Sequence, residues 1–248
     1  MKIGFLLTAY NQHEYIHDCL KDLISFARDG GHLISCVSVP FAEYEDFYQE
    51  EDGTKAIVED YYAHQQIDFL YTEPEYISEA RARTMALQPL LDCDYVMLVD
   101  ADEIYSYSDL EKIFKFVEDS EFITWWSIPL KNYWGNSYIK EPFSPPRIFK
   151  TKIGDVVLDK FYFDNEVLYR QGEQFMSFEC MTKAEIPNSL VWIPHYSWLN
   201  NERTKNKIEY QQKHFAHGAG CSYKWGDNGI ELNEEYYRKT GQAKPTIA

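Results

Sequence analysis

The chain has 248 residues, of which 45% are apolar, and its formal net charge is −16 at pH 7. This length and apolar content suit a single α/β domain, or one domain with an extension. A surface this acidic repels polyanions, which disfavours non-specific binding to nucleic acids or to anionic membranes.

Targeting and redox signals point to a cytoplasmic protein. No apolar run approaches the roughly 20 residues that a transmembrane segment needs, and the start of the chain lacks a signal-peptide layout. The five cysteines form no CxxC pair. We therefore expect neither a disulfide framework nor a structural zinc site.

The first half of the chain alternates short apolar runs with segments of helical spacing. Such apolar runs are typical of buried parallel strands. Because the two types of segment alternate four times, we expect a parallel sheet covered by helices. The expected strands are 3–8, 33–39, 67–71 and 94–99, and the expected helices are 14–27, 54–65, 78–91 and 109–117.

Several helix ends carry recognisable signals. Gly30 and Gly31 should stop the first helix, and Thr54 and Ser78 are candidate N-caps of the second and third. Pro89 should bend or end the third helix. The second half is mixed, because it has short strands separated by loops, one longer helix and an irregular tail. Its expected strands are 122–129, 147–150 and 191–198, and its expected helix is 202–217.

The fourth strand runs directly into Asp100-Ala101-Asp102-Glu103. In open α/β sheets, ligands bind beyond the carboxyl ends of the strands. Two carboxylates one residue apart can reach one cation there, and Mg²⁺ or Mn²⁺ favours oxygen ligands that it shares with phosphates. An acidic exit from a strand is also common. The position of this acidic motif, after a buried strand and four strand–helix repeats, favours a metal site.

Residues 82–87 and the stretch DYVMLVDADE that follows resemble a sequence block of GT-A-fold glycosyltransferases, mainly the inverting family 2 and its relatives. The opening LLTAYNQHEYIHDCL is similar to the start of the same family. Shorter similarities follow in order at 146–149, 163–168 and 195–198. Thr84 and Asn165 depart from the family, which has Asn and His there.

The resemblance implies a GT-A-type fold, with a Rossmann-like, mostly parallel sheet flanked by helices and a mixed β/α acceptor-side second half. We expect a single domain over residues 1–248. Its nucleotide-sugar half would be 1–105, its acceptor-side half 106–217 and its C-terminal extension 218–248.

The resemblance also implies a nucleotide pocket. Tyr10 is expected to stack on the base or to pack at the strand end, and Arg83 to meet phosphate or sugar hydroxyls, with Arg81 as its rival. The residues expected at the donor are Thr8, Ala9, Tyr10, Glu14, Arg83, Asp100 and Ala101.

The expected cofactor is Mn²⁺ or Mg²⁺. Asp102 would be the main ligand, Asp100 would contact the ion, the ribose or the sugar, and Glu103 would orient its neighbours. His195 is either a third metal ligand or a structural residue.

An inverting transfer needs a carboxylate base, for which Glu166 is the first candidate and Glu179 the second. A retaining mechanism would need no base in this position. An acceptor platform or part of the hydrophobic core is formed by Trp125, Trp126 and Trp134.

The expected function is therefore a metal-dependent glycosyltransferase (a hexosyl- or pentosyltransferase) that uses a nucleoside-diphosphate sugar, with a UDP-sugar favoured. The acceptor would be a glycan, a lipid-linked sugar or a protein, and the negative charge disfavours a hydroxymethylated DNA base. Alternatives are a metal-dependent nucleotidyltransferase and a non-catalytic sugar-nucleotide-binding module.

Overall fold

A computed structural model of the chain describes residues 1–42, 51–72, 76–120, 122–135, 137–163, 166–198, 204–205, 208–209, 222–227 and 229–248. The chain divides into two compact units, of which one comprises Met1–Pro129 with Ser144–Ile193 and the other Leu130–Phe143 with Pro194–Ala248. Most of the expected helix 202–217 lies outside the described residues. The division into a donor half, an acceptor half and an extension stays a prediction.

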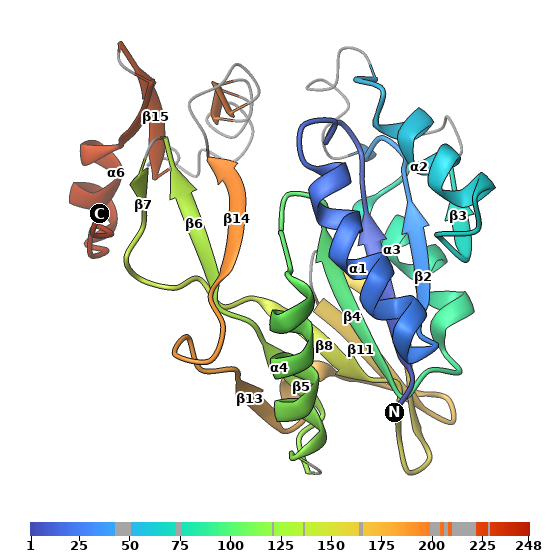
Figure 1. Ribbon diagram of the computed structural model, residues 1–248. Coiled ribbons are helices and arrows are strands. Elements are labelled where there is room, and N and C mark those ends of the chain that lie inside the picture. Colours follow the sequence, from blue (N-terminus) through green and yellow to red (C-terminus); the bar gives the residue numbers. More distant parts are fainter. Residues whose placement is uncertain are drawn as a thin grey trace. The chain divides into compact units, whose positions relative to one another are not determined.

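The first unit is built on a seven-stranded sheet of order β13-β5-β8-β4-β1-β2-β3 (Figure 1). The pairs β1–β2, β1–β4, β2–β3 and β13–β5 are parallel, whereas β8 runs antiparallel to both of its neighbours. This arrangement confirms the expected α/β class with a mostly parallel sheet. The strands are β1 (Ile3–Thr8), β2 (Leu33–Val37), β3 (Phe69–Tyr71), β4 (Tyr95–Asp100), β5 (Trp125–Ser127), β8 (Pro146–Lys150) and β13 (Lys183–Glu185).

The two central strands, β1 and β4, end at the same edge of the sheet. All six residues of β1 are buried, as the apolar run predicts. The parallel register pairs Ile3 with Tyr95 and Thr8 with Asp100. The acidic motif therefore begins at the carboxyl end of a buried central strand, where the sequence places it.

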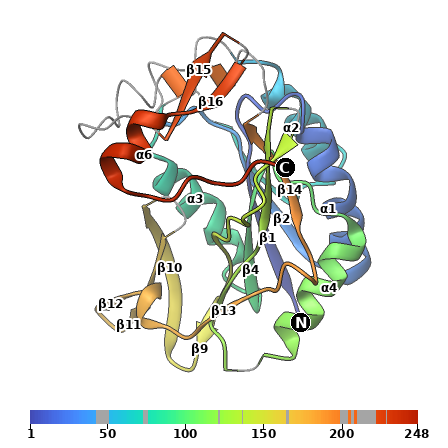
Figure 2. The same cartoon turned by 90° about the vertical axis from the view of Figure 1, so that its left-hand side faces the viewer.

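Helices cover both faces of this sheet. In Figure 2, α1 and α4 lie on one face and α3 lies on the other with the strand β10. Helix α1 ends in Gly31, whose positive φ of 65° is the left-handed C-cap that glycine adopts without strain. The helices of this unit are α1 (Ile16–Gly30), α2 (Thr54–Ala63), α3 (Glu79–Leu87) and α4 (Tyr107–Glu118).

The predicted caps are confirmed for one helix and wrong for another. Ser78 caps α3 and accepts a hydrogen bond from the backbone N–H of Arg81, and a short 3-10 turn containing Pro89 follows the helix. The N-cap of α2 is Gly53 and not Thr54, because the Thr54 hydroxyl binds Asp52 and accepts from the Gln12 N–H.

A second, four-stranded sheet of order β12-β11-β10-β9 belongs to the same unit, and α3 joins it to the main sheet. Thr84, where the family has Asn, makes this connection: its hydroxyl accepts from the Phe161 N–H at 3.0 Å and lies 2.7 Å from the Ala80 carbonyl oxygen. The strands are β9 (Lys152–Ile153), β10 (Val156–Phe163), β11 (Glu166–Gln171) and β12 (Gln174–Ser177), followed by a 3-10 turn at Phe178–Cys180.

The second unit has a three-stranded sheet of order β14-β6-β7, a hairpin and a helix. The tail, expected to be irregular, forms that hairpin and helix. Strands of four residues are too short to show a periodic pattern in the sequence. The elements are β6 (Leu130–Trp134), β7 (Ser137–Tyr138), β14 (Ile193–Trp198), β15 (Tyr223–Gly226), β16 (Gly229–Leu232) and α6 (Glu234–Thr240).

The three tryptophans considered for an acceptor platform are core residues. Trp126 is 0% exposed, Trp134 5% and Trp125 8%. Among the described residues, no helix has the length and apolar character needed to cross a membrane.

The bond between α3 and β10 can be tested by replacing Thr84 with valine, which keeps the shape and removes the hydroxyl. The Phe161 N–H then loses its acceptor, so we expect the free energy of unfolding to fall by about 1–3 kcal/mol in urea denaturation. Thr72→Val is the matched control: its hydroxyl lies in an exposed hydrogen bond to Glu59, and we expect a change within about 0.5 kcal/mol. Equal losses in the two variants would contradict this role for Thr84.

Candidate functional site

The acidic motif forms a tight turn at the carboxyl end of β4. The Glu103 N–H donates to the Asp100 carbonyl at 2.9 Å and closes the turn, while the Ala101 N–H donates to the Thr8 carbonyl at 3.3 Å. The side chains of the turn are largely buried, with exposed fractions of 1% for Ala101, 5% for Asp102 and 0% for Glu103. The backbone thus fixes three carboxylates within four residues.

Asp100 is held by three donors. One carboxylate oxygen accepts from the Thr8 hydroxyl at 2.8 Å and from Arg83 Nη2 at 2.9 Å. The other oxygen accepts from Arg147 Nη2 at 2.8 Å. Arg83 is only 2% exposed and also pairs with Glu79 at 2.6 Å, one helical turn earlier on α3. Arg83 therefore contacts Asp100 directly, and its predicted contact with the donor stays a prediction.

Glu103 forms a buried ion pair with Arg147. Arg147 Nε donates to the two Glu103 oxygens at 3.0 and 3.2 Å, and Nη2 lies 2.5 Å from Oε1. The Tyr105 hydroxyl donates to Glu103 Oε2 at 2.8 Å. Glu103 thus orients its neighbours through Arg147, as a positioning residue would.

The electrostatics follow from burial and from these pairs. Burial lowers the pKa of the Arg147 guanidinium, but Glu103 and Asp100 raise it by more, so its net shift is upward. Burial, followed by the nearby Glu103 carboxylate, raises the pKa of Tyr105 well above its ordinary value. Burial and the carboxylates of the turn likewise raise the pKa of the Cys19 thiol, so Cys19 stays protonated. The turn is thus an ionic cluster enclosed by neutral side chains.

The sequence names Asp102 as the main metal ligand of the turn, and this role stays a prediction. Within the part of the chain that the structure describes, no three His, Cys, Asp or Glu side chains form a group that could hold an ion by themselves. Mg²⁺ is often held by one or two carboxylates together with substrate phosphates, and not by a cage of protein ligands. A carboxylate at the end of a strand fits this type. Both Asp100 oxygens bind arginines, Oδ1 to Arg83 and Oδ2 to Arg147.

The loop after β1 carries the predicted nucleotide residues. Thr8 and Ala9 are buried at the strand end, Tyr10 is half-buried and Glu14 is exposed. Burial raises the pKa of the Tyr10 hydroxyl, and nearby Tyr76, Glu51 and Asp52 raise it further.

Bonds to the segment before α2 hold this loop in place. The Gln12 N–H donates to Thr54, the His13 N–H donates to Asp52, and the Asp52 N–H donates to Asn11. Asn11 itself has a positive φ of 52°, which asparagine tolerates better than most residues.

The remaining candidates lie outside the turn. Glu166 is the first residue of β11, partly exposed, and accepts a hydrogen bond from Tyr162, which raises the pKa of that tyrosine. Glu179 lies in the exposed part of the 3-10 turn after β12. The roles of both carboxylates as a base stay predictions.

His195 lies on β14, where its Nδ1 is hydrogen-bonded to the Asn132 side-chain oxygen. Because an amide oxygen can only accept, the Nδ1 atom donates in this hydrogen bond. Asn132 and His195 belong to the second unit. The role of His195 as a metal ligand stays a prediction.

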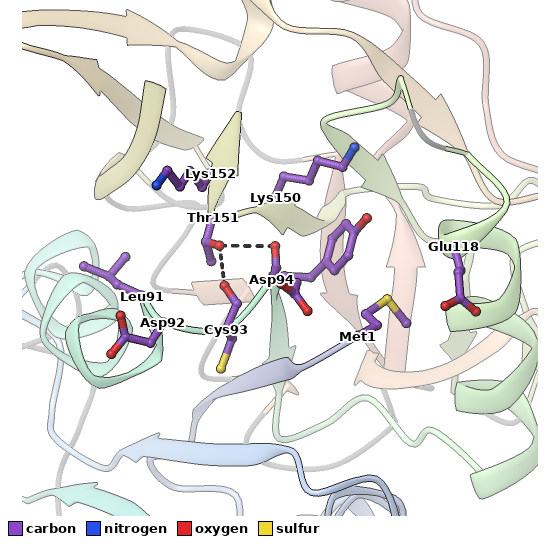
Figure 3. A pocket seen from close by; sticks show the side chains of 10 residues that line it. Met1, Leu91, Asp92, Cys93, Asp94, Glu118, Lys150, Thr151 and Lys152 are labelled. Carbon is purple, nitrogen blue, oxygen red and sulfur yellow. Dashed lines mark hydrogen bonds between the residues drawn. The ribbon is translucent and has the colours of Figure 1, made fainter. Parts of the chain in front are cut away.

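A separate pocket of about 530 Å³ lies at the opposite end of β4 (Figure 3). Its lining includes Asp94 and Tyr95, where β4 begins, and Lys150, where β8 ends. The Thr151 hydroxyl bonds to backbone carbonyls at its wall, including that of Asp94 at 3.2 Å. This pocket is distinct from the acidic turn, which follows the last residue of β4.

The partner that the sequence did not reveal is Arg147. It belongs to the segment 146–149 that resembles the family, but neither its burial nor its two acidic partners shows in the pattern. A single arginine flanked by apolar residues at the start of a strand was the available signal.

Replacing Arg147 by methionine should leave Glu103 buried without a counter-charge. We expect the free energy of unfolding to fall by about 3–5 kcal/mol in urea denaturation at neutral pH. Arg170→Met is the matched control, because Arg170 is 47% exposed in its pair with Asp159 and should cost at most about 1 kcal/mol. If the free energy of unfolding fell no further in the Arg147 variant than in the control, the Arg147–Glu103 pair would not be effectively buried.

No protein-family model matches the chain, and no curated protein sequence matches it significantly. Solved structures with a similar fold include that of S. aureus TarS 1–349, which is 15% identical with a TM-score of 0.48, over 86% of this chain and 64% of that one. Another is the mannosyltransferase PcManGT from Pyrobaculum calidifontis in complex with GDP-Man and Mn²⁺, 18% identical with a TM-score of 0.41, over 60% of this chain and 44% of that one. The chain thus spans less than two thirds of either structure, and at these identities the similarity concerns the fold alone.

Proposed function

We propose that this chain is a glycosyltransferase that moves a sugar from a nucleoside-diphosphate sugar to a hydroxyl acceptor, with a divalent cation bound jointly by Asp102 and the diphosphate. The observation that carries the proposal is the buried acidic turn at the carboxyl end of β4. Ligands of open α/β sheets bind at this edge. The resemblance of the first 105 residues to GT-A glycosyltransferases supports the same reaction.

The charge of the cluster supports the need for a cation. Arg83 and Arg147 form ion pairs with the carboxylates of Glu79, Asp100 and Glu103. Asp102 adds a further carboxylate in the same turn. Among these six side chains alone, four carboxylates face two guanidinium groups, which is an excess of two negative charges if all are ionised. A diphosphate would be repelled by such a site, and a divalent cation arriving with it removes the repulsion.

The same charge pattern points to a cation that binds together with the nucleotide. Mn²⁺ and Mg²⁺ both suit oxygen ligands, and when bound such an ion would stabilise the charge on the departing diphosphate. We propose that the nucleotide pocket is lined by Thr8, Ala9 and Tyr10, with Glu14 at the rim of this pocket. A UDP-sugar remains the favoured donor.

We propose inversion with Glu166 as the base, because its carboxylate is partly exposed at the first residue of β11. Glu179 is the second candidate and His195 the proposed additional metal ligand. A glycan, a lipid-linked sugar or a protein would supply the hydroxyl, and the net charge of −16 disfavours a nucleic acid.

The test is calorimetric titration with UDP, GDP and their sugars, with and without Mn²⁺. We expect binding that depends on the metal. Mn²⁺ alone should bind weakly, because the described residues contain no group of three side chains that could hold an ion. Donor hydrolysis or transfer separates a transferase from a binding module, and pyrophosphate release from a nucleoside triphosphate would indicate a nucleotidyltransferase. If none of these nucleotides binds in a metal-dependent way, the proposal is wrong.

Asp102→Asn should weaken metal-dependent nucleotide binding by more than about tenfold, the loss that even a supporting residue of a metal site can cause. The matched control is Asp92→Asn, an exposed aspartate at the other end of the sheet, which should bind as the unaltered protein does. Equal affinities of the Asp102 and Asp92 variants would rule out Asp102 as the ligand.

A further inference from the structure

Arg147 connects two carboxylates of the acidic turn with one guanidinium group. Its Nη2 atom lies 2.8 Å from Asp100 Oδ2 and 2.5 Å from Glu103 Oε1, and its Nε atom donates to Glu103 as well. Asp100 and Glu103 are the first and last residues of the turn. A planar guanidinium group therefore holds both ends of the turn, on either side of Asp102 in the sequence.

The strand that carries Arg147 is distorted at this residue. Trp126 of β5 pairs with Ile148 and the next residue, Ser127, pairs with Pro146, so Arg147 is the extra residue of a β-bulge. Bulges re-aim side chains and are frequent beside functional sites. On its other edge, β8 pairs with β4 only as far as Met97 with Ile148. The bulge thus lies where β8 reaches the carboxyl end of β4.

Stability alone does not account for this arrangement. Both side chains of the pair are almost fully buried, with Arg147 2% and Glu103 0% exposed. Removing two charges from water is costly, and replacement of such pairs by apolar residues is often neutral or stabilising. A role in fixing the geometry of a polar site gives a reason for charged groups at this position.

We propose that Arg147 is a positioning residue of the nucleotide site, and that its ion pair with Glu103 holds Asp100 and Asp102 in the geometry that binds the metal–nucleotide complex. This inference rests on the proposed function. Arg147 touches neither nucleotide nor metal in this account and acts through the two aspartates. Its loss should therefore weaken nucleotide binding even when the fold is restored.

The experiment separates folding from positioning. The Arg147→Met variant alone is destabilised, because the buried Glu103 carboxylate loses its counter-charge. We therefore compare it with the triple variant Arg147→Met, Glu103→Met, Tyr105→Phe. The triple variant replaces the ion pair and the hydroxyl bound to it by apolar groups of similar volume, and leaves both aspartates in place. We expect it to regain the midpoint of thermal unfolding of the unaltered protein.

Nucleotide affinity is then measured by calorimetry with UDP or GDP and Mn²⁺. The triple variant should bind about tenfold more weakly or worse, within the range typical of coupled neighbouring residues. Arg147→Lys keeps one charge but cannot bridge two carboxylates as a planar fork, so its affinity should lie in between. Arg170→Met is the control for removal of an exposed arginine and should leave affinity unchanged.

The outcomes differ for the two proposals. If the unaltered protein binds no nucleotide, the proposed function and this inference both fail. If the unaltered protein and the stable triple variant bind equally well, only the inference fails, because Arg147 is then structural. If the triple variant does not regain stability, we compare the nucleotide affinities of Asp100→Asn, Arg147→Lys and the double variant. We expect the two substitutions to have non-additive effects on affinity, because Arg147 acts through Asp100. Additive effects would contradict the inference.

Discussion

The buried ion pair between Arg147 and Glu103 is the interaction on which the acidic turn depends. Three carboxylates within four residues repel one another, and burial strengthens that repulsion because water no longer screens it. Arg147 and Arg83 neutralise part of this charge, one from the antiparallel strand β8 and the other from helix α3. The turn is therefore assembled from three segments that are distant in the sequence.

This construction explains how an acidic cluster persists in a compact fold. Asp100 accepts from Thr8 as well as from the two arginines, so its position is set by β1, α3 and β8 together. Such a carboxylate is part of the framework of the turn, whereas Asp102 is the proposed ligand of the cation.

Much of the first unit could be predicted from the sequence, because a wholly apolar run such as 3–8 and an amphipathic segment such as 14–27 leave few alternatives. The strand β4 followed in the same way, although it ends at Asp100, one residue later than expected. The α3 contact to β10 could not be predicted, since it depends on one hydroxyl, Thr84, and a backbone N–H far along the chain. The pairing of Glu103 with Arg147 could not be predicted either, because a β-bulge that re-aims Arg147 leaves no periodic pattern in the sequence.

The proposed function requires that a nucleoside diphosphate binds at the acidic turn through a cation shared with Asp102. The decisive experiment is a crystal structure of the chain grown with a nucleoside diphosphate and Mn²⁺, with the manganese located by its anomalous scattering. We expect a manganese peak between the Asp102 carboxylate and the diphosphate, beyond the carboxyl end of β4. A nucleotide bound in the pocket beside Asp94 and Lys150, at the other end of β4, would contradict it.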